Sequence, residues 1–371
     1  MAEGKIAGLR RERTLASPRY RDGRFHNSEL AVIGDVPAKS GSILASTSEY
    51  LFGSTPRRPP GALPIESPLE TWRLPADTGL RATWLGHSTT LLEIDGYRVL
   101  TDPVWSERIS PVPVVGPRRF HAVPVTLREL PPLDAVLVSH DHFDHFDVPT
   151  IRELVRLGTL TSRAVPFVTS LGVGARLEAL GVAPERILEL DWWEEATVPG
   201  TPLTFTATPS RHFSGRGLFD RNRTLWSSWV ITGERHRVFF SGDTGPTNEM
   251  LEIGARKGPF DLVMLEVGAF HESWADIHLG PDNALVAHRM LGGGTLLPVH
   301  WGTFDLALHA WDDPAEKLAA RAADLGVHVV TPRLGRAIEP SRIERIDPWW
   351  REVAPVPIDS RSAPRMPAGS L

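Results

Sequence analysis

Residues Ser139-His140-Asp141-His142-Phe143-Asp144-His145 are the stretch around which this chain is organised. They bring three imidazoles together with carboxylates, directly after the apolar run 133–138. Such side chains are seldom buried at the end of a strand without a partner, because desolvating an unpaired polar group costs free energy. The density of ligand-type side chains therefore predicts a metal site with this stretch as its main wall.

The spacing within the stretch divides the ligands into two sets. His140 and His142 are two residues apart, so in extended chain their side chains project to one side and can share a metal ion. Asp144 and His145 are adjacent and diverge, which suits a second ion beside the first. Because four ligands cannot complete two sites, further His or Asp residues are expected at other strand ends.

Three more candidate ligands follow apolar, strand-like runs. They are His212 in SRHFSG, Asp243 in SGDTG and His300 in PVHWG. In open α/β sheets, binding sites gather outside the carboxyl ends of the strands, so these loops can converge. A carboxylate between two cations offsets their repulsion, which is the role expected of Asp243. A lone strand-end histidine is most often structural, but the whole set favours metal binding.

Hydrophobic periodicity predicts alternating strands and helices. Strands are expected at 81–86, 89–94, 97–102, 133–139, 165–170, 202–210, 225–232, 236–243, 260–268, 295–300 and 327–332. Helices are expected at 148–158, 173–181, 247–258, 281–293 and 315–326. Asp95-Gly96 indicates a hairpin turn, and Asp147 is expected to cap the first of these helices. The alternation indicates a layered α/β domain.

The composition limits the chemistry. The 371 residues include no cysteine, which excludes disulfides, thiolate nucleophiles and cysteine-bound zinc. A net charge of −5 disfavours general binding to nucleic acid, so the expected partner is a small-molecule or phospholipid substrate. No signal peptide or apolar span is visible. A cytoplasmic location is expected, with any membrane contact peripheral.

The chain is expected to divide into three parts. Residues 1–78 are rich in Pro, but apolar residues such as Phe25 and Trp72 predict an arm packed on the domain rather than a solvated tail. The catalytic domain is expected at 79–340. The tail at 341–371 is Pro-rich, and its last ~15 residues are expected to be disordered.

The motifs together resemble the metallo-β-lactamase superfamily, whose signature is HxHxDH followed by His, Asp and His at strand ends. Similarity to the N-acyl-phosphatidylethanolamine-hydrolysing phospholipase D branch is carried by WLGHSTTLLEIDGYRVLTDPVWSERISPVPVVGPRRF, LPPLDAVLVSHDHFDHFD, LWSSWVI, FFSGDTG, GPFDLVMLEVGAF and PVHWGTF. The motif SPRYRDGRFHN extends the likeness into the arm. The resemblance implies an αββα sandwich, a dinuclear metal site and a homodimer.

The resemblance also assigns residues by position. One metal ion takes His140, His142 and His212. The other takes Asp144, His145 and His300, and Asp243 bridges the two. The family's further active-site histidine matches His278, and Asp144 and His278 are the residues expected to act in catalysis.

Two positions bear on the branch and the metal. Where phospholipase D members read IPIGAY, this chain reads LEVGAF, with Glu266 at the proline position, which leaves the substrate open. The oxygen-reducing di-iron branch carries Glu where this chain has His142, which argues against redox chemistry. With His and Asp donors, two Zn²⁺ ions per chain fit best, and Mn²⁺ or Fe are alternatives.

Three further residues lie beside the expected ligands. Asp102 follows a strand and is expected to orient a ligand imidazole through a hydrogen bond. His87 is expected to do the same or to contact the substrate. Trp301 directly follows His300 and is expected either beside the ligands or near the substrate.

The expected reaction is hydrolysis. A zinc-bound water ionises far more readily than bulk water, so a hydroxide between two metals can attack phosphorus or an acyl carbon. His278 would steady the developing anion or protonate the leaving group. The first hypothesis is a phosphodiesterase of the phospholipase D type acting on N-acyl-phosphatidylethanolamine-like lipids. The alternatives are a lactonase, esterase or β-lactamase at the same site, a nuclease, and a metal-binding sensor or scaffold.

Overall fold

Two β-sheets form the framework of the chain. The computed structural model describes residues 4–28, 53–110, 114–161, 164–217, 219–274 and 276–355. The seven-stranded sheet has the order β15 (Ala337–Ile338), β3 (Leu80–Gly86), β4 (Thr89–Ile94), β5 (Tyr97–Thr101), β6 (Ala135–Val138), β7 (Phe167–Ser170), β8 (Ile187–Leu190). The six-stranded sheet has the order β14 (Thr295–Val299), β13 (Leu262–Glu266), β12 (Arg237–Phe240), β11 (Ser228–Thr232), β10 (Thr204–Thr208), β9 (Glu195–Thr197).

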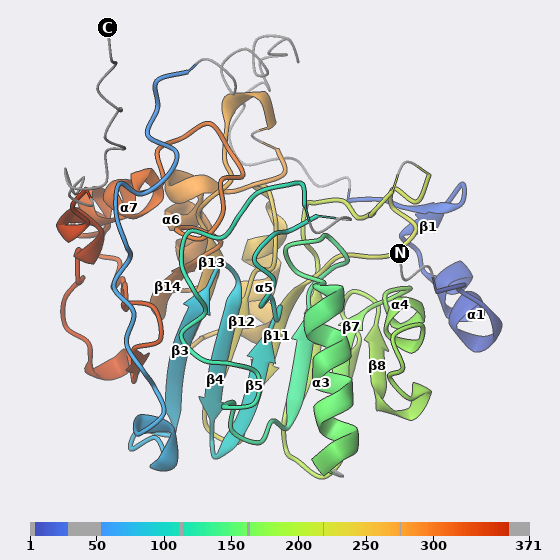
Figure 1. The fold of residues 1–371 in the computed structure, drawn as a ribbon. Coiled ribbons are helices and arrows are strands. Elements are labelled where there is room, and N and C mark those ends of the chain that lie inside the picture. The colour runs from blue at the N-terminus through green and yellow to red at the C-terminus, as the bar shows by residue number, and fades with distance from the viewer. Residues whose placement is uncertain are drawn as a thin grey trace, which may run out of the picture.

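Helices cover the outer faces of both sheets (Figure 1). They are α3 (Val148–Thr161) and α4 (Gly174–Glu178) on the seven-stranded sheet, and α5 (Glu249–Lys257), α6 (Gly280–Met290) and α7 (Asp313–Ala322) on the other side. Helix α3 packs Ile151 and Leu154 against Val136 and Val138 of β6. The layers therefore run helix, sheet, sheet, helix, which confirms the predicted αββα sandwich.

Strand direction brings the ends of several strands to one edge. In the seven-stranded sheet β5, β6, β7 and β8 are parallel, and in the six-stranded sheet β12, β13 and β14 are parallel. The carboxyl ends of each parallel set lie on the same edge of its sheet, where binding sites form in such sheets. At the opposite end of β4, Asp95 and Gly96 both have positive φ, as a two-residue hairpin turn requires.

The core lies between the two sheets and is continuous with an aromatic group at one side. Leu92 and Leu137 of the first sheet and Phe205 and Val263 of the second are fully buried in it. Trp301 stacks on Trp84 with ring centroids 5.4 Å apart and on Trp349 at the same distance. The C-terminal segment, through η4 (Pro340–Arg342) and η5 (Trp349–Glu352), therefore contributes to the core.

The N-terminal arm packs on the domain along its described parts (Figure 1). It forms α1 (Gly8–Ala16), the two-stranded sheet of β1 (Tyr20–Arg21) and β2 (Arg24–Phe25), and η1 (Thr71–Arg73). Phe25 is buried with Trp192 and Trp226. In the tail, the residues expected to be disordered lie outside the described part of the chain. No helix among the described residues is long and apolar enough to cross a membrane.

The strand predicted at 327–332 is wrong. Val329 makes only an isolated parallel bridge with Leu296. The N–H of Leu296 donates to the carbonyl of His328, and the N–H of Val330 donates to the carbonyl of Leu296. The next hydrogen bond of the ladder would need the N–H of residue 298, which is a proline and has none. The strand that follows in the chain is β15, which was not predicted. It pairs with β3 at the edge of the seven-stranded sheet.

Two local expectations also need correction. No helix was predicted within the arm, but residues 8–16 form α1. Asp147 precedes α3 as predicted, but its carboxylate accepts hydrogen bonds from the backbone N–H groups of Trp105 and Ser106 and from the Thr150 hydroxyl. It therefore ties the loop after β5 to the start of α3.

Candidate metal centre

The seven residues predicted as ligands converge from four strand ends. The stretch 140–145 follows β6, His212 follows β10, Asp243 follows β12 and His300 follows β14. Among the described residues, potential ligand atoms gather in three sets, within each of which all atoms lie within 4.8 Å of one another. The first set is His140, His142, His212 and Asp243. The second is His87, Asp144, His145 and His300. The third set, Asp243, Glu266, His278 and His300, overlaps with the predicted ligands at Asp243 and His300.

In the first set, three imidazole nitrogens point at one another. The His142 Nδ1 atom lies 2.9 Å from His140 Nε2 and 3.2 Å from His212 Nε2. The Asp243 Oδ2 atom lies 3.8 Å from His140 Nε2 and 3.7 Å from His212 Nε2. At most one proton can lie along each of these contacts, so lone pairs of several nitrogens face a common point. This is the arrangement that a cation would satisfy.

In the second set, the carboxylates of Asp144 and Asp243 lie between histidines. Asp144 Oδ2 is 3.5 Å from His145 Nε2, 3.3 Å from His300 Nε2 and 3.0 Å from His87 Nε2. Asp243 reaches the same histidines, with Oδ2 3.1 Å from His145 Nε2 and Oδ1 3.3 Å from His300 Nε2. Asp243 therefore adjoins both sets, which is the position expected of a bridging carboxylate.

Several ligand rings are held by hydrogen bonds on their far side. Asp102 Oδ2 accepts from His145 Nδ1 at 2.6 Å, and its two oxygens also accept from the N–H and hydroxyl of Ser139 at 2.7 Å. His212 Nδ1 lies 2.9 Å from the carbonyl oxygen of Ile277 and donates to it. In both rings the far-side donation leaves the Nε2 lone pair free to bind a metal.

The arm residue Asn27 also holds a ligand, and the sequence analysis did not identify it. Its Nδ2 donates to the carbonyl of His212 at 2.9 Å, and its Oδ1 accepts from the N–H of His212 at 3.1 Å. The same oxygen accepts from Trp226 Nε1 at 3.0 Å. The signal was present in SPRYRDGRFHN, the arm motif that shares the family likeness and ends at Asn27.

The backbone at three strand ends is strained. His87, Asp102 and His300 have φ values of +54°, +32° and +63°. Side chains other than glycine rarely adopt such values, and residues that do are concentrated at functional sites. From these turns His87 and His300 enter the second set, and Asp102 contacts His145 from behind.

Buried atoms without a hydrogen-bond partner support a cation at this point. Within the described part of the chain, His145 Nε2, His300 Nε2 and Asp243 Oδ1 are buried and have no such partner. Unpaired buried polar atoms are uncommon because each one costs free energy. All three belong to the first two sets, so their chemistry fits divalent metal ions.

The carboxylates of the cluster raise the pKa of two of its histidines. Burial lowers the pKa of His145, but Asp243, Asp144 and Asp102 outweigh burial and hold that pKa well above its usual range. Burial likewise lowers the pKa of His300, but Asp243 and Asp144 raise it to about 10. The carboxylates thus draw protons onto these imidazoles, and a divalent cation would supply the positive charge instead.

His87 lies within the second set itself. Its Nε2 contacts Asp144, and its ring centroid is 4.0 Å from that of His300. Burial lowers its pKa to about 3, so it is a neutral ring. The Thr303 hydroxyl accepts a hydrogen bond from the backbone N–H of His87 at 2.7 Å, which fixes the turn after β3.

Glu266 and His278 adjoin the first two sets. Glu266 ends β13 and is fully buried, and its Oε2 lies 2.7 Å from His278 Nδ1. The His278 ring centroid lies 5.2 Å from that of His212 and 5.4 Å from that of His300. Burial raises the pKa of Glu266 and lowers that of His278, but Glu266 outweighs burial at the histidine and leaves its pKa raised.

Trp301 does not lie where it was expected. Its indole is buried in the aromatic group with Trp84 and Trp349, and its Nε1 donates to the carbonyl of Pro298. His300 has left β14 and has a positive φ, so the chain turns between the two residues, and Trp301 packs in the core while His300 faces the cluster.

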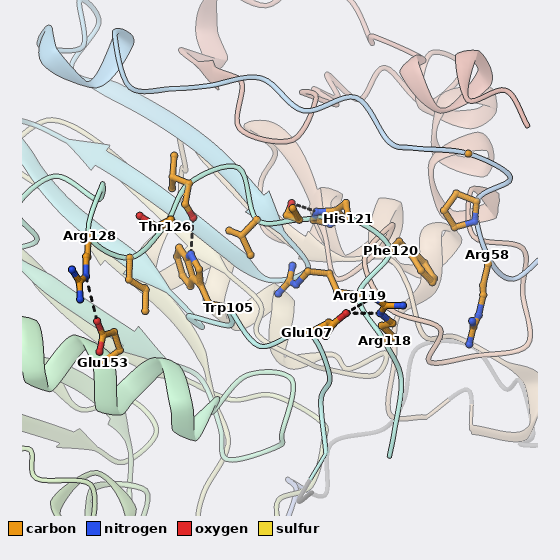
Figure 2. A pocket seen from close by; sticks show the side chains of 16 residues that line it. Arg58, Trp105, Glu107, Arg118, Arg119, Phe120, His121, Thr126, Arg128 and Glu153 are labelled. Atoms are coloured by element: carbon orange, nitrogen blue, oxygen red, sulfur yellow. Dashed lines mark hydrogen bonds and ion pairs between the residues drawn. The ribbon is translucent and has the colours of Figure 1, made fainter. Parts of the chain in front are cut away.

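A groove of about 1040 Å³ lies beside the centre, on the loops between β5 and β6 (Figure 2). Its apolar lining is Trp105, Phe120, Val123, Val125 and Leu127, and arginines 58, 118, 119 and 128 also line it. Arg118 pairs with Glu107, and Arg128 lies 3.9 Å from Glu153. Phe120 also lines a small cavity with His300, and His121 of the groove contacts the Thr303 hydroxyl, which accepts a hydrogen bond from the N–H of His87.

Comparison with known families matches residues 97–301 to a beta-lactamase superfamily domain. An uncharacterized protein of Mycobacterium tuberculosis is 47% identical over 338 residues, which cover 90% of this chain and 88% of that protein. N-acyl-phosphatidylethanolamine-hydrolyzing phospholipase D 1 of Caenorhabditis elegans is 36% identical over 252 residues, covering 66% and 70% of the two chains.

Among solved structures, a metallo hydrolase from the archaeon Ignicoccus hospitalis has the same fold. It aligns with a TM-score of 0.52 and 22% sequence identity, covering 70% of this chain and 97% of that one. At this level of identity the likeness concerns the fold alone.

Proposed function

Because this chain belongs to the metallo-β-lactamase superfamily, in the branch of the N-acyl-phosphatidylethanolamine-hydrolysing phospholipase D proteins, we propose that it is a dinuclear zinc phosphodiesterase acting on phospholipids. Metal-dependent hydrolysis follows from the family itself. The phosphodiester substrate, the two ions and their identity as zinc are the proposed part.

The observation that carries the proposal is the convergence of seven His and Asp residues, among which Asp243 Oδ2 lies 3.7 Å from His212 Nε2 and 3.1 Å from His145 Nε2. Within these residues His140, His142 and His212 would hold one ion, and Asp144, His145 and His300 the other. Nitrogen and carboxylate donors without cysteine suit zinc. A scaffold that binds no metal would not need the buried, unpaired atoms of His145 and His300.

Divalent cations at this centre would lower the pKa of a water molecule and polarise the phosphoryl group. The protein's own residues do the rest. Asp102 keeps the His145 ring in place, Asn27 holds the loop of His212, and His278 lies at the edge of the cluster with part of its side chain accessible. His278 is therefore the group placed to donate a proton to the leaving oxygen.

The substrate class is supported by the relative from Caenorhabditis elegans and by the groove beside the centre. The apolar lining of the groove suits an acyl chain. We propose that lipid bound along this groove presents its phosphodiester to the metal centre. Contact with a bilayer surface would then be peripheral.

The experiment that tests this function combines metal analysis with a substrate panel. Purified protein should contain close to two zinc ions per chain, and His142→Ala or Asp243→Ala should lose metal and activity together. The panel is an N-acyl-phosphatidylethanolamine, a generic phosphodiester, an aryl lactone and a chromogenic β-lactam. Glu93→Gln is the matched control, because it alters a buried carboxylate paired with Arg81 and Arg98 in another part of the fold.

Each outcome of the panel has a clear meaning. Turnover of the phosphodiesters supports the proposal. Turnover confined to the lactone or the β-lactam rejects the phosphodiesterase in favour of acyl hydrolysis. Full activity in metal-free protein would contradict the metal centre as a whole, and full metal content without any turnover would favour a sensor or scaffold.

A further inference from the structure

Glu266 is a fully buried carboxylate whose hydrogen bonds all lead to the loops around the metal centre. We propose that Glu266 is a positioning residue, which holds His278 as the proton donor to the leaving oxygen and so enables the chain to cleave phosphodiesters of unactivated alcohols. This inference rests on the proposed phosphodiesterase activity and extends it from the metal ions to the leaving group.

Both oxygens of Glu266 are occupied. Oε1 accepts from the backbone N–H of Thr244 at 2.9 Å and of Leu279 at 3.1 Å. Oε2 lies 2.7 Å from His278 Nδ1. Thr244 follows Asp243 and Leu279 follows His278 in the chain, so one carboxylate joins the loop of the bridging aspartate to the loop of the histidine.

The anchoring on Oε1 fixes the direction of Oε2, because backbone N–H groups can only donate. A carboxylate accepts hydrogen bonds. His278 Nδ1 must therefore carry a hydrogen and donate a hydrogen bond to Glu266. Nε2 is then the nitrogen left to meet a substrate. The ring is held beside His212 and His300, and its side chain is 12% exposed, so a bound molecule can reach it.

Water adds to phosphorus, the bond between phosphorus and the alcohol oxygen breaks with its electron pair on that oxygen, and His278 Nε2 donates the proton that completes the alcohol. The proton lost by the water restores His278. An alkoxide is a poor leaving group and requires this proton, whereas a nitrophenolate leaves without it. General acid catalysis of this kind contributes about 10²–10⁴-fold.

The test compares two substrates in the zinc-loaded enzyme. In Glu266→Gln, which preserves size, the amide N–H₂ would face Nδ1 and reverse the direction of the hydrogen bond. We expect kcat for a dialkyl phosphodiester to fall about 100-fold, with little change in KM, while kcat for bis(p-nitrophenyl) phosphate changes less than threefold. His278→Ala should show the same selectivity, and the double variant should lose no more than either single variant.

A second readout does not depend on activity. In the wild-type protein, the imidazole ¹H–¹⁵N spectrum should show a hydrogen-bonded Nδ1–H of His278, and this signal should be lost in Glu266→Gln while zinc content stays the same. Equal losses on both substrates, or loss of zinc in Glu266→Gln, would overturn the positioning role. If the wild type cleaves neither phosphodiester, the proposed function fails, and the Nδ1–H signal still decides whether Glu266 holds His278.

Discussion

At the scale of single residues, the metal centre depends on the hydrogen bonds behind its ligands. Asp102 is buried and contacts His145 and Ser139, and Ser139 in turn lies 3.0 Å from His140 Nδ1. Asp102 thus orients His145 of the second set directly, and it reaches His140 of the first set through the Ser139 hydroxyl. Removing its charge should therefore affect metal binding more than folding.

We expect Asp102→Asn to weaken zinc binding about 10- to 100-fold, the range found for partners of metal-bound histidines. The amide keeps the size of the side chain but cannot accept on both atoms. Competition with a zinc-chelating dye measures the affinity. Asp95→Asn is the matched control, because Asp95 is also buried and bonded to a histidine, His236 at 2.7 Å, on the hairpin turn. Equal affinities in wild type and Asp102→Asn would contradict the role of Asp102.

The residues that gather in the candidate centre could be predicted from the sequence, because few residue types bind divalent metals and each of these followed an apolar run. Asp102 could also be predicted as a partner of a ligand imidazole, but the ring it contacts and the contribution of Asn27 could not, since these contacts depend on where distant loops meet. His87 and Asp144 are 57 positions apart, and Asn27 and His212 are 185 apart. Trp301 was misplaced because adjacency in sequence to His300 says nothing about which side of the strand end its ring faces.

At the scale of elements, the N-terminal arm is part of the centre. The β1–β2 hairpin buries Phe25 against the loops of the domain and so places Asn27 beside His212. Helix α1 is held in turn by ion pairs of Arg10 with Glu178 and Glu189. Its sequence lacks a clear apolar face, and its partners lie far along the chain, which explains why it was not predicted.

We expect Asn27→Ala to lower the free energy of unfolding by about 1–3 kcal/mol, because it leaves the buried N–H and C=O of His212 without their partners. Zinc affinity should fall as well, since the loop that carries His212 loses its anchor. Urea unfolding and zinc titration measure the two effects. His26→Ala is the control, because the side chain of this neighbour contacts the carbonyl of Arg21 on the hairpin, 3.2 Å away. Unchanged zinc affinity in Asn27→Ala would show that the arm does not support the centre.

Strands were predicted well where an apolar run was bounded by turn residues, as for β6 and β12. The exception at 327–332 has such a run but faces Pro298, so the composition of the neighbouring strand decided the outcome. That information is not contained in the segment itself. The pairing of the short β15 with β3 likewise depends on the fold around it.

At the scale of the whole molecule, the C-terminal segment closes the core next to the metal centre. Trp349 is fully buried and packs on Trp84 and Trp301, and Trp301 directly follows the ligand His300. Expectations from sequence placed this segment outside the domain. Its two tryptophans show that the core extends beyond residue 340.

Trp349→Ala should lower the free energy of unfolding by about 3–5 kcal/mol, because it leaves a large cavity in the aromatic group. Urea unfolding monitored by circular dichroism measures the change. Leu74→Ala, at a side chain that is 65% exposed, should change stability by less than about 0.5 kcal/mol. A loss below 1 kcal/mol in Trp349→Ala would mean that the segment is not an integral part of the core.

Metal binding should stabilise the folded molecule as a whole. The cluster brings Asp144 and Asp243 together with five histidines at strand ends of both sheets, so ions bound there connect the two halves of the sandwich. A ligand that binds only the folded state adds about 2.7 kcal/mol at a concentration 100 times its Kd. We therefore expect free zinc at that concentration to raise the unfolding midpoint relative to chelator-treated protein. Asp95→Asn should retain the whole shift, and Asp243→Asn should lose most of it. Identical midpoints with and without zinc in the wild type would contradict the metal centre whatever the substrate.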